Sequence, residues 1–441
     1  MELPVAYCQR SCNLEFMKNQ KAAPPAWQKE IYLNGFSGIK PRVNIDFHLL
    51  EETAKKNMSP EAFAYIAGGA GNESTMSSNR QAFEKYKIIP RMLRDVSERD
   101  MSLELFGQTF PAPILLSPVG VLEMVNKEAD VAVGKAAAEF GLPYIFSNQS
   151  SCPMEAVAAA MGSSPRWFQL YWSKSNDLVA SFIQRAEKSG CSAIAVTLDT
   201  SMLGWRTRDL DIAYLPFLEG KGIAQYTSDP VFQKLMDEPD EDPPAKRKIT
   251  AQTINGVIQM VKNYPGTGFL SKLISGRPLK AVQKFTSIYS NPALTWEDLK
   301  FLRQHTKLPI LLKGILHPDD ARKAVDYGME GIIVSNHGGR QVDGSISTLE
   351  ALPHIVQSVG GKIPVIMDSG VRGGADIFKA LALGAKAVCI GRPYVYGLAI
   401  AGEEGVKTVL RNFLTDFELT MGLAGCKNLS EINRNTLTQG G

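Results

Sequence analysis

The sequence has no large excess of charge of either sign, since its 48 Lys and Arg residues and 45 Asp and Glu residues among 441 leave a formal net charge of +3. It also has no long basic block, so nucleic acid and anionic membranes are not expected as partners. No apolar run reaches membrane-spanning length, and no basic start followed by an apolar core marks a secretory signal. The last residues are not a peroxisomal signal. We therefore expect a soluble, cytoplasmic protein.

Cysteine is scarce, and no two cysteines form a CxxC pair. Two of the six lie in or beside apolar, strand-like runs, which favours buried free thiols in a reducing compartment. Neither disulfides nor a metal site are expected. The six are Cys8, Cys12, Cys152, Cys191, Cys389 and Cys426.

Short apolar runs of strand type are present eight times and alternate with helical patterns. Most are apolar almost throughout, as expected of parallel strands that helices cover on the outside. This alternation predicts an α/β fold of the (β/α)8, or TIM-barrel, type. A doubly wound sheet is the alternative, but it needs a reversal of strand order and rarely reaches eight units. The predicted strands are residues 113–117, 143–147, 166–170, 193–198, 309–313, 331–335, 363–368 and 387–391.

Helix-start signals support the alternation. Asn176-Asp177 precedes a predicted helix over 178–189, and Thr295 and the acidic residues after it precede one over 299–305. His317 followed by Pro318 opens a third, which runs to residue 327, so His317 is interpreted as a helix-start residue.

Two segments lie outside the repeat. Residues 1–111 form a predicted N-terminal arm and helical segment that packs on the barrel of residues 112–441. A long stretch between the fourth and fifth strands, from Asp199 to about Pro292, includes the polar and proline-rich residues 237–244. Because it leaves from the carboxyl end of a strand, we interpret it, from about 207 to 292, as an active-site lid rather than an idle linker.

The most informative motif is Ser335-Asn336-His337-Gly338-Gly339-Arg340, directly after the sixth strand. Histidine transfers protons near neutral pH, and the arginine fork matches a carboxylate. The pair predicts deprotonation of a small organic acid beside its carboxylate. The alternative is a polar loop whose histidine caps a helix.

Other polar residues follow the remaining strands, where barrel enzymes carry their working groups. The loops after strands seven and eight combine glycines with Arg372 and Arg392, which predicts a phosphate site. Lys313, at the end of strand five, suits either a Schiff base or the stabilisation of negative charge on a bound ring. Ser147, Gln169 and Thr197, at the ends of neighbouring strands, are neutral hydrogen-bonding residues that suit the polar edge of a flavin ring. Together with the phosphate site, these residues predict FMN as the cofactor.

Asp199 follows the fourth strand and has two interpretations. It could hydrogen-bond the His337 imidazole and stabilise its protonated form, or it could be a structural residue that caps the next segment. Spacing alone does not separate them.

With these residues assembled, the chain resembles the FMN-dependent α-hydroxy-acid oxidases and dehydrogenases, the family of glycolate oxidase, lactate oxidase and mandelate dehydrogenase. The resemblance covers about residues 30–437 as one domain and rests above all on the motif from Ser335 to Gln341. It implies that His337 is the base, that Asp199 is its partner, and that the family's homotetramers or homo-octamers are expected here. It further implies that Arg340, Arg206 and Tyr65 bind the substrate carboxylate and Tyr171 its hydroxyl group. The residues that it implies for FMN are Pro118, Val119, Gly120, Ser147, Gln169, Thr197, Lys313, Ser335, Asp368, Ser369, Gly370, Val371, Arg372, Gly391 and Arg392.

Within the family, residues 30–35, 204–210 and 229–234 resemble the lactate 2-monooxygenase branch, as does the long insertion. The oxidases carry alanine where this chain has Gly120, and that branch carries glycine. Gln149 replaces a tryptophan of glycolate oxidase, so the wall of the substrate pocket differs.

The resemblance implies oxidation of a short L-2-hydroxy acid, above all L-lactate, by O₂. In this branch the keto acid is decarboxylated in the site to acetate, carbon dioxide and water, because a lid retains it. The alternatives are an oxidase that releases keto acid and hydrogen peroxide, a dehydrogenase with another electron acceptor, and a catalytically silent flavin-binding protein.

Overall fold

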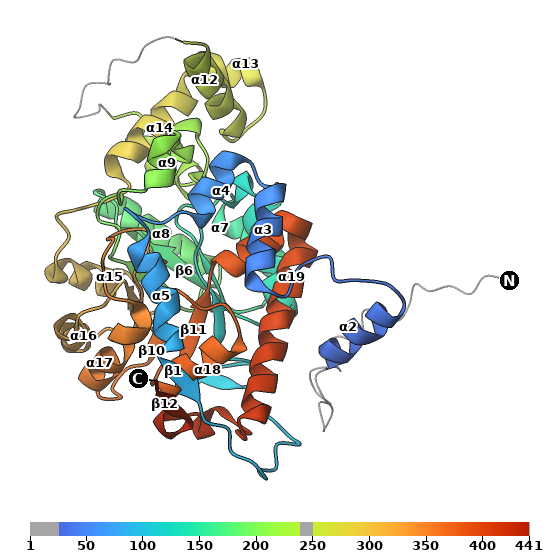
Figure 1. The fold of residues 1–441 in the computed structure, drawn as a ribbon. Coiled ribbons are helices and arrows are strands. Elements are labelled where there is room, and N and C mark those ends of the chain that lie inside the picture. Colours follow the sequence, from blue (N-terminus) through green and yellow to red (C-terminus); the bar gives the residue numbers. More distant parts are fainter. Residues whose placement is uncertain (1–25, 239–249, 441) are drawn as a thin grey trace.

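The computed structural model describes residues 26–238 and 250–440. Within them, eight parallel strands close into a barrel in the order β10-β11-β4-β5-β6-β7-β8-β9 (Figure 1). All eight predicted strands are confirmed to within two residues at each end. They are β4 (Ile114–Leu116), β5 (Tyr144–Phe146), β6 (Arg166–Leu170), β7 (Ile194–Thr197), β8 (Ile310–Lys313), β9 (Gly331–Val334), β10 (Val365–Met367) and β11 (Ala387–Ile390).

These runs form strands that are buried on both faces, and every residue in them is buried. Their β-branched and aromatic side chains alternate between the barrel interior and the layer of helices. The register places polar residues of neighbouring strands side by side at the carboxyl end, as where Thr197 of β7 pairs with Lys313 of β8.

A helix follows each strand on the outside of the barrel, after the insertion in the case of β7, which confirms the predicted alternation. Ser175 caps α8 by accepting from the Leu178 backbone N–H, and His317 caps α16 through Nδ1, which accepts from the Asp319 N–H. The predicted role of His317 is therefore confirmed. These helices are α6 (Ala129–Glu139), α7 (Met154–Met161), α8 (Asn176–Lys188), α15 (Leu299–His305), α16 (Pro318–Asp326), α17 (Thr348–Val359), α18 (Gly374–Ala382) and α19 (Arg392–Leu423).

The segment before the barrel contributes helices that pack on it and short strands that the sequence did not predict. α2 (Ala26–Phe36) buries no residue but contacts α19, where Trp27 Nε1 donates to Asn412 Oδ1 over 2.7 Å. α3 (Phe47–Asn57), α4 (Pro60–Ala67) and α5 (Ser74–Glu84) pack against the barrel (Figure 1). β1 (Tyr86–Ile88) pairs with β12 (Leu437–Gln439) near the other end of the chain.

A hairpin of β2 (Leu103–Leu105) and β3 (Gln108–Phe110) covers the amino end of the barrel. Its apolar side chains pack against inward-facing barrel residues, among them Trp167. The Phe106 ring lies 5.7 Å from that of Trp167, centroid to centroid. This end of the barrel is therefore filled by side chains.

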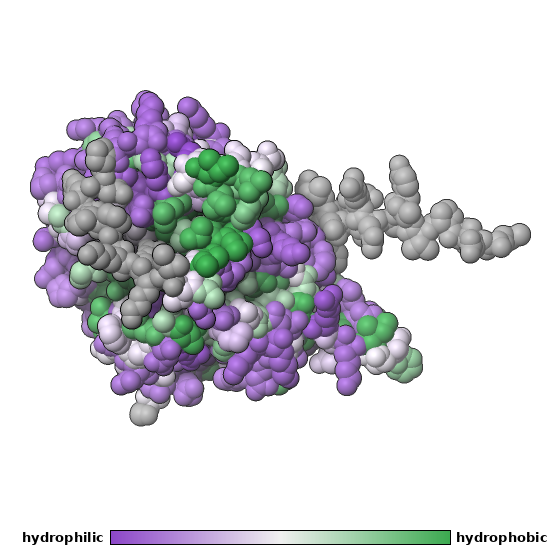
Figure 2. All heavy atoms as spheres, turned by 90° about the horizontal axis from the view of Figure 1, so that it is seen from above, coloured by the Kyte–Doolittle hydropathy of each residue, from purple (hydrophilic) through white to green (hydrophobic). Residues whose placement is uncertain are grey.

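The insertion after β7 is largely helical and lies over the carboxyl end of the barrel (Figure 1). Residues 239–249 of the predicted polar stretch lie outside the described residues. Seen from above in Figure 2, apolar surface gathers over this part, where α12 and α13 leave Ile254, Leu270 and Ile274 exposed. The helices of the insertion are α9 (Thr207–Asp211), α10 (Ala224–Thr227), α11 (Pro230–Leu235), α12 (Ala251–Asn263), α13 (Phe269–Ser275) and α14 (Arg277–Ile288).

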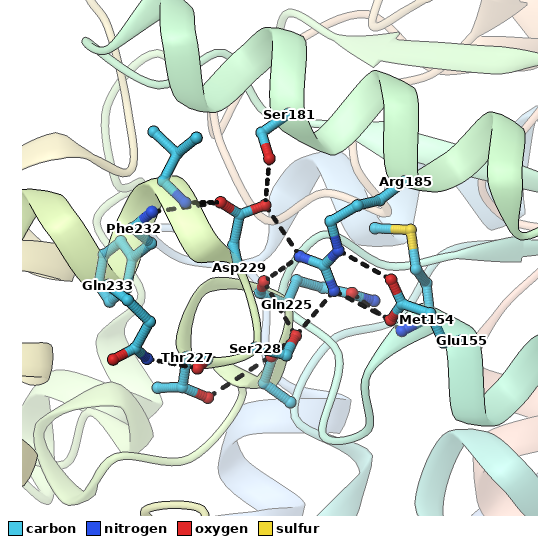
Figure 3. A network of polar contacts seen from close by, with 12 residues as sticks. Met154, Glu155, Ser181, Arg185, Gln225, Thr227, Ser228, Asp229, Phe232 and Gln233 are labelled. Atoms are coloured by element: carbon cyan, nitrogen blue, oxygen red, sulfur yellow. Dashed lines mark hydrogen bonds and ion pairs between the residues drawn. The ribbon is translucent and has the colours of Figure 1, made fainter.

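An ionic network with a buried centre at Arg185 and Asp229 attaches the middle of the insertion to the barrel helices (Figure 3). Arg185 of α8 donates to both carboxylate oxygens of Glu155 on α7 and, over 3.1 Å, to fully buried Asp229. Asp229 also caps α11 by accepting from the Val231 and Phe232 N–H groups. The insertion is therefore fixed at this point, and not only at its two ends.

Among the described residues the four cysteines are free thiols, and no group of three or more His, Cys, Asp or Glu side chains is placed to hold a metal ion. The helices of the described ranges include none with the length and hydropathy needed to span a bilayer.

Candidate active site

A cavity opens at the carboxyl end of the barrel, with about 1090 Å³ of space that is partly open to solvent. Residues from seven of the eight strand-end loops, from α4 and from the insertion line it. Sixteen predicted site residues lie on its wall: Tyr65, Pro118, Val119, Gly120, Tyr171, Arg206, Lys313, His337, Arg340, Asp368, Ser369, Gly370, Val371, Arg372, Gly391 and Arg392.

The loop after β9 holds His337 in an unusual backbone conformation. His337, Gly338 and Gly339 have φ values of 58°, 67° and 77°, a run of left-handed residues that is costly for histidine. The Ser335 hydroxyl accepts from the His337 N–H, and the Ser369 hydroxyl accepts from the Gly338 N–H. The strain is therefore held by neighbouring strand ends and directs the imidazole into the cavity.

Asp199 is placed as the partner of this imidazole. His337 Nδ1 lies 2.9 Å from Asp199 Oδ1 and, beside a carboxylate, must carry the proton. Nε2 is therefore left as a free acceptor, 3.5 Å from the Tyr171 hydroxyl. Of the two interpretations of Asp199, the geometry favours the histidine partner.

Electrostatics keep this pair in a resting state that suits a base. Burial lowers the pKa of His337 more than Asp199 raises it, so the imidazole is neutral. Although burial acts to raise the pKa of Asp199, its interactions with His337, including the hydrogen bond from Nδ1, and the charge of Lys313 lower it, so this group is a carboxylate. Burial, together with Asp199, raises the pKa of Tyr171 to about 12, which keeps the phenol protonated.

Two guanidinium groups, those of Arg206 and Arg340, face the same part of the cavity, and no carboxylate of the described residues is hydrogen-bonded between them. Burial and the neighbouring charge of Arg206 lower the pKa of Arg340 to about 9. Arg340 donates to the carbonyl oxygens of Tyr65 and Gly68, and both guanidiniums lie over the Tyr65 ring, at 4.9 Å for Arg340 and 5.9 Å for Arg206. In the part of the chain that the structure describes, the hydrogen-bond acceptors of these two buried guanidiniums are neutral, and the Asp209 carboxylate is a nearby charge that interacts with both. The pair therefore forms a site for an anion such as a carboxylate.

A second pair of cations lies beside the loops after β10 and β11. Burial and the charge of Arg392 lower the pKa of Arg372 to about 10, and its buried Nε has no hydrogen-bond partner among the described residues. Arg392 donates to the carbonyl oxygens of Ile66, Gly338 and Gly68. Ser369 and Gly370 both have φ of 85°, which turns the loop tightly at this point. The unused donor and the paired charges suit a phosphate.

Lys313 lies in a buried polar cluster at the base of the cavity. Its Nζ donates to the Ser335 hydroxyl over 2.9 Å and lies 3.1 Å from Asp368 Oδ2. Asp368 also accepts from the hydroxyls of Ser117 and Ser335. Burial opposes the charge on Lys313, but Asp368 and Asp199 raise its pKa, so the amine stays protonated. A protonated lysine favours charge stabilisation over the Schiff base that the sequence left open.

The remaining predicted residues lie just beneath the cavity and not on its wall. Gln169 Oε1 accepts from the Ser147 hydroxyl over 3.2 Å, and its Nε2 donates to the Thr197 hydroxyl over 3.0 Å. Ser335 connects Lys313 to Asp368, as described above. These groups are buried and order the polar floor of the site.

The profile of the FMN-dependent dehydrogenase family matches residues 54–439 of this sequence. The chain belongs to this family. An FMN-dependent α-hydroxy acid dehydrogenase of Penicillium citrinum is 42% identical over 413 residues, which cover 93% of this chain and 95% of that protein. The L-lactate oxidase of Lysinibacillus sphaericus is 42% identical over 395 residues, which cover 90% and 93%. The crystal structure of mandelate oxidase superposes with a TM-score of 0.72 at 33% identity and covers 90% of this chain and 98% of that one.

FMN is the cofactor of this family member, and FMN-dependent oxidation of a 2-hydroxy acid is its reaction class. The site fits FMN in two places that differ in chemistry. Arg372, with its unpartnered Nε, and Arg392 supply positive charge for the phosphate, and Lys313 supplies a separate buried cation at the floor of the cavity.

Several cavity residues were not predicted from the sequence. Phe217 and Tyr289 come from the insertion, and Thr200, Met202 and Leu203 come from its first residues. Their apolar character resembles that of any packed segment, so no sequence signal separates them. Only their position just before Arg206 could have indicated Met202 and Leu203.

Proposed function

We propose that this protein oxidises a short L-2-hydroxy acid, with L-lactate as the first candidate, and decarboxylates the keto acid before releasing it. The observation that carries the oxidation is the pairing of a neutral His337 with Asp199 beside the cation pair Arg206 and Arg340. The net reaction converts lactate and O₂ into acetate, carbon dioxide and water, which balances all atoms.

In this proposal Arg206 and Arg340 bind the carboxylate of the hydroxy acid and fix its orientation. The Tyr171 phenol, protonated at neutral pH, donates to the substrate oxygen. His337 Nε2 accepts the proton from the substrate, and Asp199 stabilises the imidazolium that forms. Bound FMN supplies the acceptor for the two electrons that leave the substrate.

The insertion supports the retention of the product. Gly222 donates its N–H to Glu123 in the loop after β4, and a Cβ at Gly222 would come within 2.6 Å of Val121 Cγ2. Phe217, a few residues earlier, lines the cavity. The insertion therefore packs closely against the loop that carries Gly120. Such packing should slow the release of the keto acid, so that peroxide reacts with it inside the cavity.

Gly120 is the residue through which the decarboxylation is tested. A Cβ there would lie 3.0 Å from both Cβ and the carbonyl oxygen of Gln149. Gly120→Ala should therefore crowd this wall at a cost of about 1–3 kcal/mol in stability and disturb the retained product.

The experiment is a single turnover with L-lactate, in which the protein is first reduced without oxygen and then exposed to O₂. Acetate and carbon dioxide should dominate for the parent, and pyruvate with peroxide should increase for Gly120→Ala. Pyruvate and stoichiometric peroxide from the parent would reject the decarboxylation and leave a hydroxy-acid oxidase, the second candidate, which the 42% identity to an L-lactate oxidase favours.

Two further proposals concern the whole protein. Assembly into homotetramers or homo-octamers should give a mass in solution of four or eight times 48.2 kDa. A cytoplasmic location stays a prediction, which localisation of the tagged full chain would test.

A further inference from the structure

Gln341 directly follows the catalytic motif and uses its whole side-chain amide on the first residues of the insertion. Its Nε2 donates to the carbonyl oxygens of Asp199, over 2.6 Å, and Met202, over 2.9 Å. Its Oε1 accepts from the Gly204 N–H and from Arg206 Nη2, each over 3.3 Å. The neutral side chain of Gln341 thus contacts both the backbone of Asp199, which is the partner of His337, and the guanidinium of Arg206.

The backbone is shaped for this contact. A Cβ at Gly204 would lie 2.5 Å from the Arg340 carbonyl oxygen and 2.9 Å from Gln341 Cα, so only glycine lets the insertion approach the motif. Arg206 Nε donates to the same Arg340 carbonyl over 3.4 Å. The amide of Gln341 and the glycine together fix the distance between the two strand-end loops.

We infer that Gln341 is a positioning residue for substrate binding: it orients Arg206 toward the substrate carboxylate and keeps Asp199 in line with His337. A neutral amide suits this task because it satisfies Arg206 without neutralising it, so the charge stays available to the substrate. A carboxylate at this position would pair with Arg206 and compete with the ligand. The inference rests on the proposed role of Arg206 as a carboxylate ligand.

Two variants separate positioning from packing. Gln341→Leu removes all four hydrogen bonds with little change of volume, and Gln341→Glu keeps the shape but faces two carbonyl oxygens with a negative charge. KM for L-lactate should rise about tenfold in Gln341→Leu, as for the loss of a hydrogen bond to a charged group, and at least as much in Gln341→Glu. The rise in KM should exceed the fall in kcat in both. A packing role predicts the reverse order, with the isosteric glutamate as the milder change.

Affinity for pyruvate, measured through the change in flavin absorbance without turnover, gives a second readout. It should weaken in step with KM in both variants. Ser228→Ala is the matched control, since it removes one hydrogen bond from Arg185 elsewhere in the insertion and should leave KM and pyruvate affinity within about twofold.

Unchanged KM and pyruvate affinity in the Gln341 variants, or a glutamate variant milder than the leucine one, would overturn the inference. A parent protein that neither binds pyruvate nor is reduced by any small 2-hydroxy acid would instead overturn the proposed function itself. The two failures are therefore distinguishable.

Discussion

His337 combines a strained backbone with a fixed imidazole tautomer. Its φ of 58° is held by the Ser335 hydroxyl of the same loop, which accepts from the His337 N–H, and by the Ser369 hydroxyl of the next loop, which accepts from the Gly338 N–H. Asp199 fixes the proton on Nδ1. Such strain persists only where the surroundings enforce it, and here it directs the free nitrogen into the cavity. A residue that replaces His337 would therefore have to adopt the positive φ and also supply a proton acceptor that faces the cavity.

Asparagine tolerates the left-handed backbone, so His337→Asn removes the base with little added strain. Anaerobic reduction of the flavin by L-lactate, the proposed substrate, should slow by about 10²–10⁴-fold, because the variant lacks the proposed acceptor of the substrate proton. Stopped-flow absorbance measures this rate, and FMN content serves as the control for folding. A loss below tenfold in a fully FMN-loaded variant would mean that another residue is the base.

The pH dependence tests the Asp199 partnership. The His337 pKa lies below its ordinary value of 6.5 because burial outweighs the effect of Asp199, and only the neutral imidazole accepts a proton. On the acid side, kcat/KM should therefore fall as the pH drops through that lowered pKa, and not already at the ordinary value.

Asp199→Asn removes a charge that raises the His337 pKa, so the acid limb of the kcat/KM profile should move to lower pH. The plateau should fall by about 10²–10³-fold, since the imidazolium loses its counter-charge. A profile between about pH 5 and 9 measures both effects. An acid limb that moves to higher pH would contradict the assignment.

At the scale of elements, the insertion behaves as a part of the fold that is fixed to the barrel at more than one point. Arg185, on a barrel helix, contacts Asp229 of the insertion and Glu155 of the preceding helix (Figure 3). Gln225 connects the same region to the site, because its side chain accepts from the Met154 N–H and donates to the Ser147 carbonyl over 3.4 Å.

Asp229→Ala should lower the free energy of unfolding by about 3 kcal/mol, because it leaves Arg185 less compensated and removes the cap of α11. Asp229→Asn keeps the cap and should cost less. Thermal denaturation of the FMN-loaded proteins measures the difference. Equal melting temperatures for Asp229→Ala and the parent would show that the network is not needed to attach the insertion.

The elements that could be predicted from the sequence are those with a strong local pattern. The barrel strands are continuous apolar runs that end in polar or glycine residues, so both their positions and the residues after them followed directly. The strands β1, β2, β3 and β12 are only three residues long and carry no extended apolar run, and β1 and β12 pair across almost the whole chain. The insertion helices escaped prediction because their composition is mixed.

In the site, residues at strand ends could be placed together from the topology alone. The meeting of Asp199 with His337 could not, because it depends on side-chain direction and on a turn with three successive positive φ values. Phe217 and Tyr289 reach the cavity only through the tertiary packing of the insertion, which no local pattern describes.

At the scale of the whole molecule, bound FMN is expected to stabilise the folded protein. Without it, Arg372 and Arg392 lie close together without a bound anion, and burial makes that arrangement costly. Removing FMN should therefore lower the melting temperature, and FMN at about 1,000 times its Kd should restore about 4 kcal/mol.

Inorganic phosphate should restore part of this loss in the FMN-free protein, because it supplies the anion without the ring. Differential scanning calorimetry of the FMN-free protein, with and without phosphate, measures the effect. The control is Arg372→Met, in which phosphate should stabilise less. A melting temperature that does not respond to FMN would contradict the role of the cation pair.

The hairpin of β2 and β3 limits the routes by which small molecules can reach and leave the cavity. Because its side chains fill the amino end of the barrel together with Trp167, the barrel axis offers no through-passage among the described residues. Within the part of the chain that the structure describes, the 2-hydroxy acid and its product must therefore use the same mouth, between the insertion and the strand-end loops. With a shared opening, the product must leave before the next substrate molecule can enter.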